Sequence, residues 1–213
     1  MKLKLDFVSK EPKQTKDNEI FLVNDKSSKN KLLKSVYKSL LANKLFSEKK
    51  FLSKNINNKN YIFVNCIKSK TSLDYEKLGS QLYIFLKNNK IDNSFLVSNA
   101  SYLTNVQFEK FLHGAQLKSY QFDVYKTDKS KKDIINLYVV GIKSKKSNIL
   151  RNKLNSLLQG IFLTRDLVSE PGNVLHPDEY ARRITKLRKF GLKVTVYDQK
   201  KLKKMGMNAL LGV

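Results

Sequence analysis

Hydrophobic and polar positions along the chain follow two periods in turn, and this predicts alternating strands and helices. Strands are predicted, from period-two or continuous apolar runs, at 1–9, 19–24, 61–67, 94–98 and 134–142. Helices are predicted, from apolar residues at helical spacing, at 31–46, 71–88 and 106–120. Thr71 and Asp74 stand at the spacing of a capping box. This order predicts an α/β layered domain with a mainly parallel sheet.

The pattern changes after residue 146. A long helix is predicted at 148–169, and Pro171 with Gly172 ends it because proline cannot continue a helix. Pro177 then suits the first position of a new helix. The remaining elements are predicted as a helix at 177–190, a strand at 193–197, a short helix at 199–205 and a strand-like apolar tail at 210–213. A strand needs a sheet on which to bury itself, so we expect 147–213 to be marginal alone.

Three ordered stretches carry a resemblance to a known family. Residues 164–181 read Thr-Arg-Asp-Leu-Val-Ser-Glu-Pro-Gly-Asn-Val-Leu-His-Pro-Asp-Glu-Tyr-Ala. This resembles the pattern A-R-D-L-V-N-E-P-x-N-x-L-T-P-E-E-F/Y-A of the leucyl aminopeptidase (cytosol aminopeptidase) family. Residues 111–126 are similar to the family's E-G-A-x-L-x-x-Y-x-F-x-x-Y-K, and 192–211 to its L-x-V-x-V-x-D … G-M-x-x-L-L.

The resemblance implies a fold and a division of the chain. It implies a macro-domain-like layered sheet with flanking helices in 1–146, followed in 147–213 by a long interdomain helix and a truncated start of a second α/β domain, the catalytic one. Family members are metallo-exopeptidases with two divalent ions, Zn or Mn, and they assemble as hexamers. Their metal ligands and catalytic Lys and Arg lie beyond the position that matches Val213. We therefore expect no catalytic, cofactor-binding or metal-binding residue in 1–213.

Charge and composition add one alternative. The formal charge is +24, and only five of the 42 basic residues are Arg. Lysines spread over every segment favour a solvated surface over a dedicated nucleic-acid site, which would favour the planar Arg fork. Nonspecific nucleic-acid binding stays open. No apolar stretch approaches the ~18 residues of a membrane span, and residues 1–8 alternate like a strand, so we expect a cytoplasmic protein without a membrane partner.

Each residue that could act in catalysis or metal binding also has a structural interpretation. His113 and His176 are far apart in sequence and have no ligand-type neighbour at metal spacing, so packing or capping roles are expected. His176 stands where the family places Thr, so its helix cap is either weaker or supplied by the imidazole. Asp178 and Glu179 diverge around a helix start and are expected to interact with its dipole.

The remaining candidates have the same character. Arg165 and Asp166 match the family pattern and are expected to form a structural ion pair or hydrogen bond. Cys66 lies in an apolar run and is expected to be a buried core residue. Isolated glycines cannot build a phosphate-cradling loop; they are Gly79, Gly114 and Gly141.

Three hypotheses follow. The first is that the chain is the noncatalytic front part of a leucyl aminopeptidase acting on peptides. The second is a stand-alone noncatalytic assembly or binding module. The third, supported by charge alone, is a basic nucleic-acid-binding protein.

Overall fold

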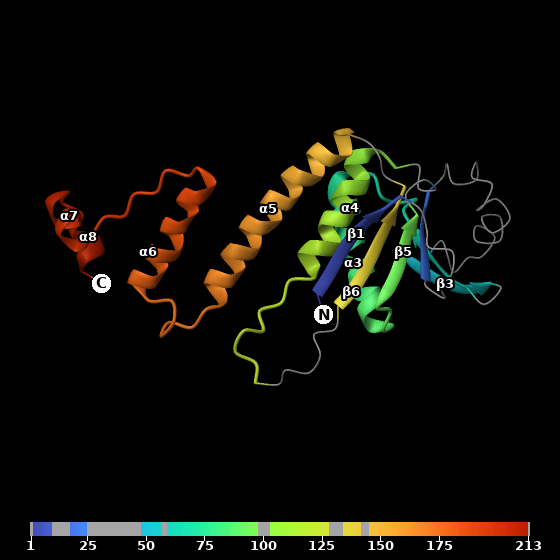
Figure 1. Cartoon of the computed structure of the whole chain (residues 1–213), viewed down its shortest axis with the longest axis horizontal. Coiled ribbons are helices and arrows are strands. Elements are labelled where there is room, and N and C mark those ends of the chain that lie inside the picture. Colours follow the sequence, from blue (N-terminus) through green and yellow to red (C-terminus); the bar gives the residue numbers. More distant parts are fainter. Residues whose placement is uncertain are drawn as a thin grey trace. The chain divides into compact units, whose positions relative to one another are not determined.

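A computed structural model describes residues 2–9, 18–24, 48–56, 59–97, 103–127, 134–141 and 145–212 (Figure 1). The chain divides into two compact units, Met1–Phe162 and Leu163–Val213. The domain boundary expected at 146/147 stays a prediction. The helix predicted at 31–46 lies outside the described residues.

The first unit is built on one six-stranded sheet. Its strands are β1 (Lys2–Val8), β2 (Asn18–Val23), β3 (Phe51–Ile56), β4 (Lys59–Asn65), β5 (Asn93–Val97) and β6 (Ile134–Val140). Their order is β1-β6-β5-β2-β4-β3, and every pair is parallel except β3 with β4. The predicted α/β class and mainly parallel sheet are confirmed. β3 was not predicted, because three consecutive polar residues, 53–55, interrupt its apolar pattern at the edge of the sheet.

Two helices cover one face of this sheet (Figure 1): α3 (Ser72–Asn88) and α4 (Asn105–Lys118). Alternate strand residues point to the helices and to the opposite face, as the period of two requires. The helix-side core contains Ile20, Ile62 and Leu96 with Leu82 and Phe111 from the helices. A second, smaller cluster on the strands contains Phe21, Val23, Phe63 and Val97. β2 and β4 are thus buried on both faces, which explains their continuous apolar sequence.

Both helices begin with a capping box. The Thr71 hydroxyl accepts from the Asp74 backbone N–H, and the Asp74 carboxylate accepts from the Thr71 N–H, as the spacing predicted. Thr104 and Gln107 repeat the arrangement at α4. These side chains satisfy backbone donors that a helix start otherwise leaves unpaired.

Two glycines allow α3 and α4 to approach very closely. A Cβ atom added at Gly79 would lie 1.8 Å from the Phe111 carbonyl oxygen, and one at Gly114 would lie 1.8 Å from the Glu76 carbonyl oxygen. Neither position tolerates a larger residue without a shift of backbone. The two glycines therefore act in helix packing.

A row of polar side chains links five strands near the amino ends of the parallel ones. Ser53 Oγ donates to Asn60 Oδ1 at 2.7 Å, and Asn60 Nδ2 donates to Asn18 Oδ1 at 2.5 Å. Asn18 Nδ2 donates to the Asn93 carbonyl at 3.1 Å, and Asn136 Nδ2 to Asn93 Oδ1 at 3.0 Å. This row fixes the relative register of strands that are distant in sequence.

The long helix predicted after residue 146 is α5 (Lys145–Ser169). Within the first unit it packs through the buried residues Leu154 and Leu158. Arg151 donates to both carboxylate oxygens of the buried Glu109, at 2.5 and 3.1 Å, and its guanidinium lies 3.6 Å from the centre of the Phe7 ring. A bidentate pair and an apolar contact together hold α5 in the first unit.

After the last residues of α5, the described part of the second unit contains four further helices. They are α6 (Pro177–Thr185), the 3-10 helix η3 (Lys186–Phe190), α7 (Gln199–Lys204) and α8 (Asn208–Leu211). The strand predicted at 193–197 is wrong, since this segment has no regular structure, and the strand-like tail is wrong because Asn208–Leu211 is helical. The physical reason is common to both: the described part of this unit offers no neighbouring strand with which they could pair.

Candidate functional site

The segment that carries the 164–181 motif forms the end of α5, a tight turn and the start of α6. The Pro171 carbonyl accepts from the N–H groups of Val174 and Leu175, both at 2.9 Å, which closes the turn. Pro177 takes the first helical position as predicted. His176 is the N-cap residue and makes no side-chain capping bond, so of the two possibilities left open the weaker cap is the correct one.

An ion-pair cluster joins the two sides of this turn. Arg183 bonds Glu170, which precedes the turn, and Glu179 in α6, both at 2.8 Å. Arg182 also donates to both oxygens of Glu179, at 2.5 and 2.6 Å. Hydrogen bonds from these two arginines lower the pKa of Glu179 to about 2. A carboxylate held so firmly in its charged form suits a structural role.

His113 is packed inside the first unit, which is one of the two roles, packing or capping, that were expected for the histidines. Its side chain is 2% exposed, and Nδ1 lies 3.7 Å from Glu76 Oε2, too far for a hydrogen bond. Burial lowers the pKa of His113, and the attraction of Glu76 opposes part of that effect. The ring therefore acts as a neutral core group. It borders a cavity of about 110 Å³ that Glu109 and Arg151 also line.

Cys66 is buried, as predicted, with 2% of its surface exposed. Burial raises the pKa of its thiol to about 12. Because only the thiolate is a nucleophile, this cysteine is chemically inert at neutral pH.

The described residues do not fit a metal centre. Among them, no group of three or more His, Cys, Asp and Glu side chains lies close enough together to hold an ion. The two-ion site that the family resemblance implies therefore cannot be assembled from the described part of this chain. Arg165 and Asp166 both lie on α5, and their expected structural pairing stays a prediction.

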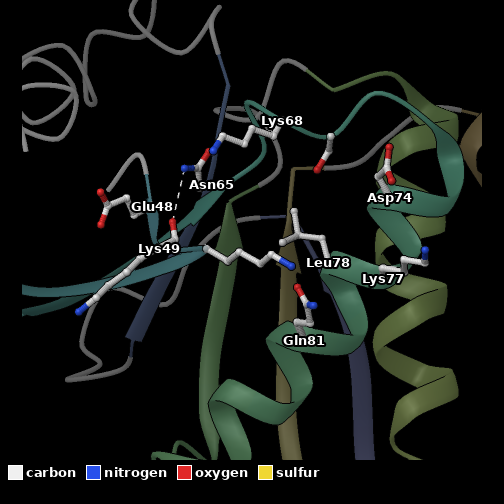
Figure 2. Close-up of a pocket in the computed structure, with 10 residues that line it drawn as sticks. Glu48, Lys49, Asn65, Lys68, Asp74, Lys77, Leu78 and Gln81 are labelled. Carbon is white, nitrogen blue, oxygen red and sulfur yellow. Dashed lines mark hydrogen bonds between the residues drawn. The ribbon is translucent and has the colours of Figure 1, made fainter. Parts of the chain in front are cut away.

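A cavity of about 310 Å³ lies where β3 begins, β4 ends and α3 starts (Figure 2). Its walls combine four lysines and two carboxylates with neutral polar residues and one buried leucine. The lining residues are Glu48, Lys49, Lys50, Asn65, Lys68, Ser69, Asp74, Lys77, Leu78 and Gln81. The sequence analysis missed this cavity, because residues 48–50 reach it only through the antiparallel pairing of β3 with β4.

Hydrogen bonds from one asparagine hold two walls of this cavity together. The Asn65 backbone N–H donates to the Lys50 carbonyl at 2.8 Å, and Asn65 Nδ2 donates to the Lys49 carbonyl at 3.4 Å. Asn65 Oδ1 accepts from the Ile67 N–H at 3.1 Å and shapes the loop after β4. The two loops are consequently fixed against each other before any ligand is present.

No helix among the described residues is both long enough and apolar enough to cross a membrane.

Comparison with solved structures concerns the fold. The fold is similar to that of a tomato leucine aminopeptidase variant, with a TM-score of 0.70 and 18% identity, over 96% of this chain and 46% of that chain. It is also similar to the bottromycin maturation enzyme BotP in complex with Mn, with a TM-score of 0.63 and 15% identity, over 90% of this chain and 40% of that one. The chain thus shares its fold with part of each of these two proteins, over less than half of their length.

Sequence comparison then gives a match to one family over part of the chain. Residues 162–213 match the profile of the cytosol aminopeptidase family, catalytic domain. The probable cytosol aminopeptidase of Phytoplasma mali (strain AT) is 38% identical over 116 residues, 52% of this chain and 23% of that protein. That of Gluconobacter oxydans (strain 621H) is 44% identical over 102 residues, 47% of this chain and 21% of that protein. These matches support a relation to the leucyl aminopeptidase (cytosol aminopeptidase) family, and the chain spans about a fifth of the length of these curated relatives.

Proposed function

We propose that residues 1–213 are the noncatalytic front part of a metal-dependent leucyl aminopeptidase that releases N-terminal amino acids from peptides in the cytoplasm. The observation that carries this proposal is the match of residues 162–213 to the catalytic domain of the family. The described part of the chain lacks a metal-ligand group, so the two divalent ions, Zn or Mn, would be held by other residues. We further propose a hexameric assembly for the whole polypeptide.

In this proposal residues 1–213 have a structural role. The sheet unit folds around its own core, and the bidentate Glu109–Arg151 pair ties the first part of α5 to it. The Glu170–Arg183–Glu179 cluster then fixes the turn from α5 into α6. The first pair acts within the sheet unit, and the second cluster acts within the unit that follows.

The direct test is an activity assay on the purified 213-residue chain. With leucine p-nitroanilide and added Mn²⁺ or Zn²⁺, we expect no hydrolysis above a control containing metal without protein. Hydrolysis that a chelator abolishes would overturn the noncatalytic assignment. Sequencing the coding region past the codon for Val213 is the second test. We expect an in-frame continuation with an acidic ligand cluster, whereas an immediate stop codon would contradict the proposed parent enzyme.

One observation favours a second candidate, a noncatalytic assembly module. Large apolar side chains of the second unit are exposed, among them Phe190 at 81% and Leu210 at 63%. Exposed apolar patches mark sites of protein–protein interaction. Light scattering distinguishes the candidates in part: a monodisperse monomer of the purified chain would count against self-assembly through this surface.

A further inference from the structure

We propose that the cavity between β3, β4 and α3 binds a small phosphorylated molecule. The inference is independent of the aminopeptidase proposal. The cavity of about 310 Å³ lies at the lower end of the size range of small-molecule sites. It adjoins the carboxyl end of β4, and ligands of open α/β sheets bind beyond the carboxyl ends of the parallel strands.

The charge of the cavity favours an anion. Four lysines line it, at positions 49, 50, 68 and 77, against the two carboxylates of Glu48 and Asp74. The Asp74 carboxylate is already engaged, because it accepts from the backbone N–H groups of Lys70 and Thr71 at 3.1 and 2.8 Å. Within the described residues, none of the four ammonium groups forms an ion pair within 4 Å. The positive charge is therefore only partly compensated.

Two of these lysines come from neighbouring segments that Asn65 links by hydrogen bonds. Lys50 precedes β3, and Lys68 follows β4. Lys77 and Asp74 both lie on α3 (Figure 2), and the charge of Lys77 acts on the Asp74 carboxylate. Lys50 and Lys68 are consequently the pair that we assign to the ligand.

Neutral groups complete the site. The Ser69 hydroxyl and the Gln81 amide line the cavity and can donate hydrogen bonds. Leu78, 4% exposed, supplies an apolar surface on which the organic part of a ligand can pack. Two ammonium groups and two neutral donors exceed what one carboxylate needs, and they match the larger number of acceptor oxygens and the charge of a phosphate or pyrophosphate group.

The test must separate this cavity from the general positive charge of the chain. We suggest titrating the full chain with inorganic pyrophosphate at physiological salt by calorimetry. The double variant Lys50→Gln/Lys68→Gln removes the proposed pair. The control Lys87→Gln/Lys118→Gln removes the same charge from the exposed last turns of α3 and α4, away from the cavity.

We expect the cavity variant to weaken pyrophosphate binding at least tenfold and the control to bind like the original chain. Amide NMR shifts should be confined to residues 48–50, 65–69 and 74–81. Equal weakening in both variants, shifts spread over lysines throughout the chain, or no binding at all would overturn the proposal. A single-stranded oligonucleotide that binds while pyrophosphate does not would also overturn it, and would assign the phosphate affinity to nucleic acid.

Discussion

Both units of this chain contain large apolar residues, but the two units differ in whether those residues are buried. In Met1–Phe162, strands and helices bury a continuous core, and residues such as Ile20, Leu82 and Phe111 are completely inaccessible. In Leu163–Val213, none of the helices contains a buried residue. Its turn and helices are held instead by caps, ion pairs and local backbone bonds.

The difference shows what a sheet contributes. A helix satisfies its backbone groups within its own segment, whereas a strand needs a neighbour. The apolar residues Val194 and Val196 therefore have a strand-like pattern without strand structure, and Val196 stays 50% exposed. The two units therefore differ in the burial of their apolar residues, and not in the presence of such residues.

Hydrogen exchange should give the largest contrast between them. Amides of β4 exchange only when the sheet opens, while those of 192–198 are not part of a strand or helix. Opening free energies range from about 0 in exposed segments to the global value of ~5 kcal/mol or more, so β4 amides should exchange at least ~10³-fold more slowly. Comparable protection in both segments would show that the second unit has a stable core of its own.

Gly114→Ala should destabilise the first unit severely. The added Cβ would collide with the Glu76 carbonyl oxygen, and relief requires α3 and α4 to separate. We expect a loss of about 3 kcal/mol or more in the free energy of unfolding, measured by urea titration. Gly160→Ala is the matched control, because no atom lies within 4 Å of its added Cβ; it should stabilise α5 by about 0.5–1 kcal/mol. A neutral Gly114→Ala would contradict the close helix packing.

Arg151→Met should destabilise the first unit by about 3 kcal/mol, since it leaves the charge of the buried Glu109 without its partner. The double variant Glu109→Gln/Arg151→Met should recover much of this loss, because no unpaired charge remains. Thermal unfolding with a double-mutant cycle measures the coupling. Additive effects of the two substitutions would exclude the proposed ion pair.

Acid should produce the smallest of these effects in the first unit, through His113. Burial lowers its pKa below the ordinary 6.5, so the unfolded chain binds a proton first as the pH falls. The contribution of the neutral ring to stability is therefore complete above pH ~6.5 and is lost below it. Urea titrations at pH 7.5 and 5.5 should show a smaller decrease for His113→Leu than for the original chain. His176→Leu, at an exposed position, is the control and should keep the full decrease.

The sequence by itself determined the elements whose signals are local. The capping box of Thr71 and Asp74, the end of the long helix at Pro171 and the new start at Pro177 all appear as predicted, because their hydrogen bonds and steric constraints involve only nearby residues. The continuous apolar run of β4 likewise indicated a strand buried on both faces. The 164–181 motif was sufficient to indicate the family, and the comparisons support it.

Tertiary structure decided the features that depend on partners distant in the chain. It paired the polar β3 with β4, brought Gly79 against Phe111 and placed the lysines of residues 48–50 beside those after β4. It also left 193–197 without a sheet, although the apolar alternation there predicted a strand. Periodicity records which side of an element is apolar, but only the fold supplies the surface that buries it.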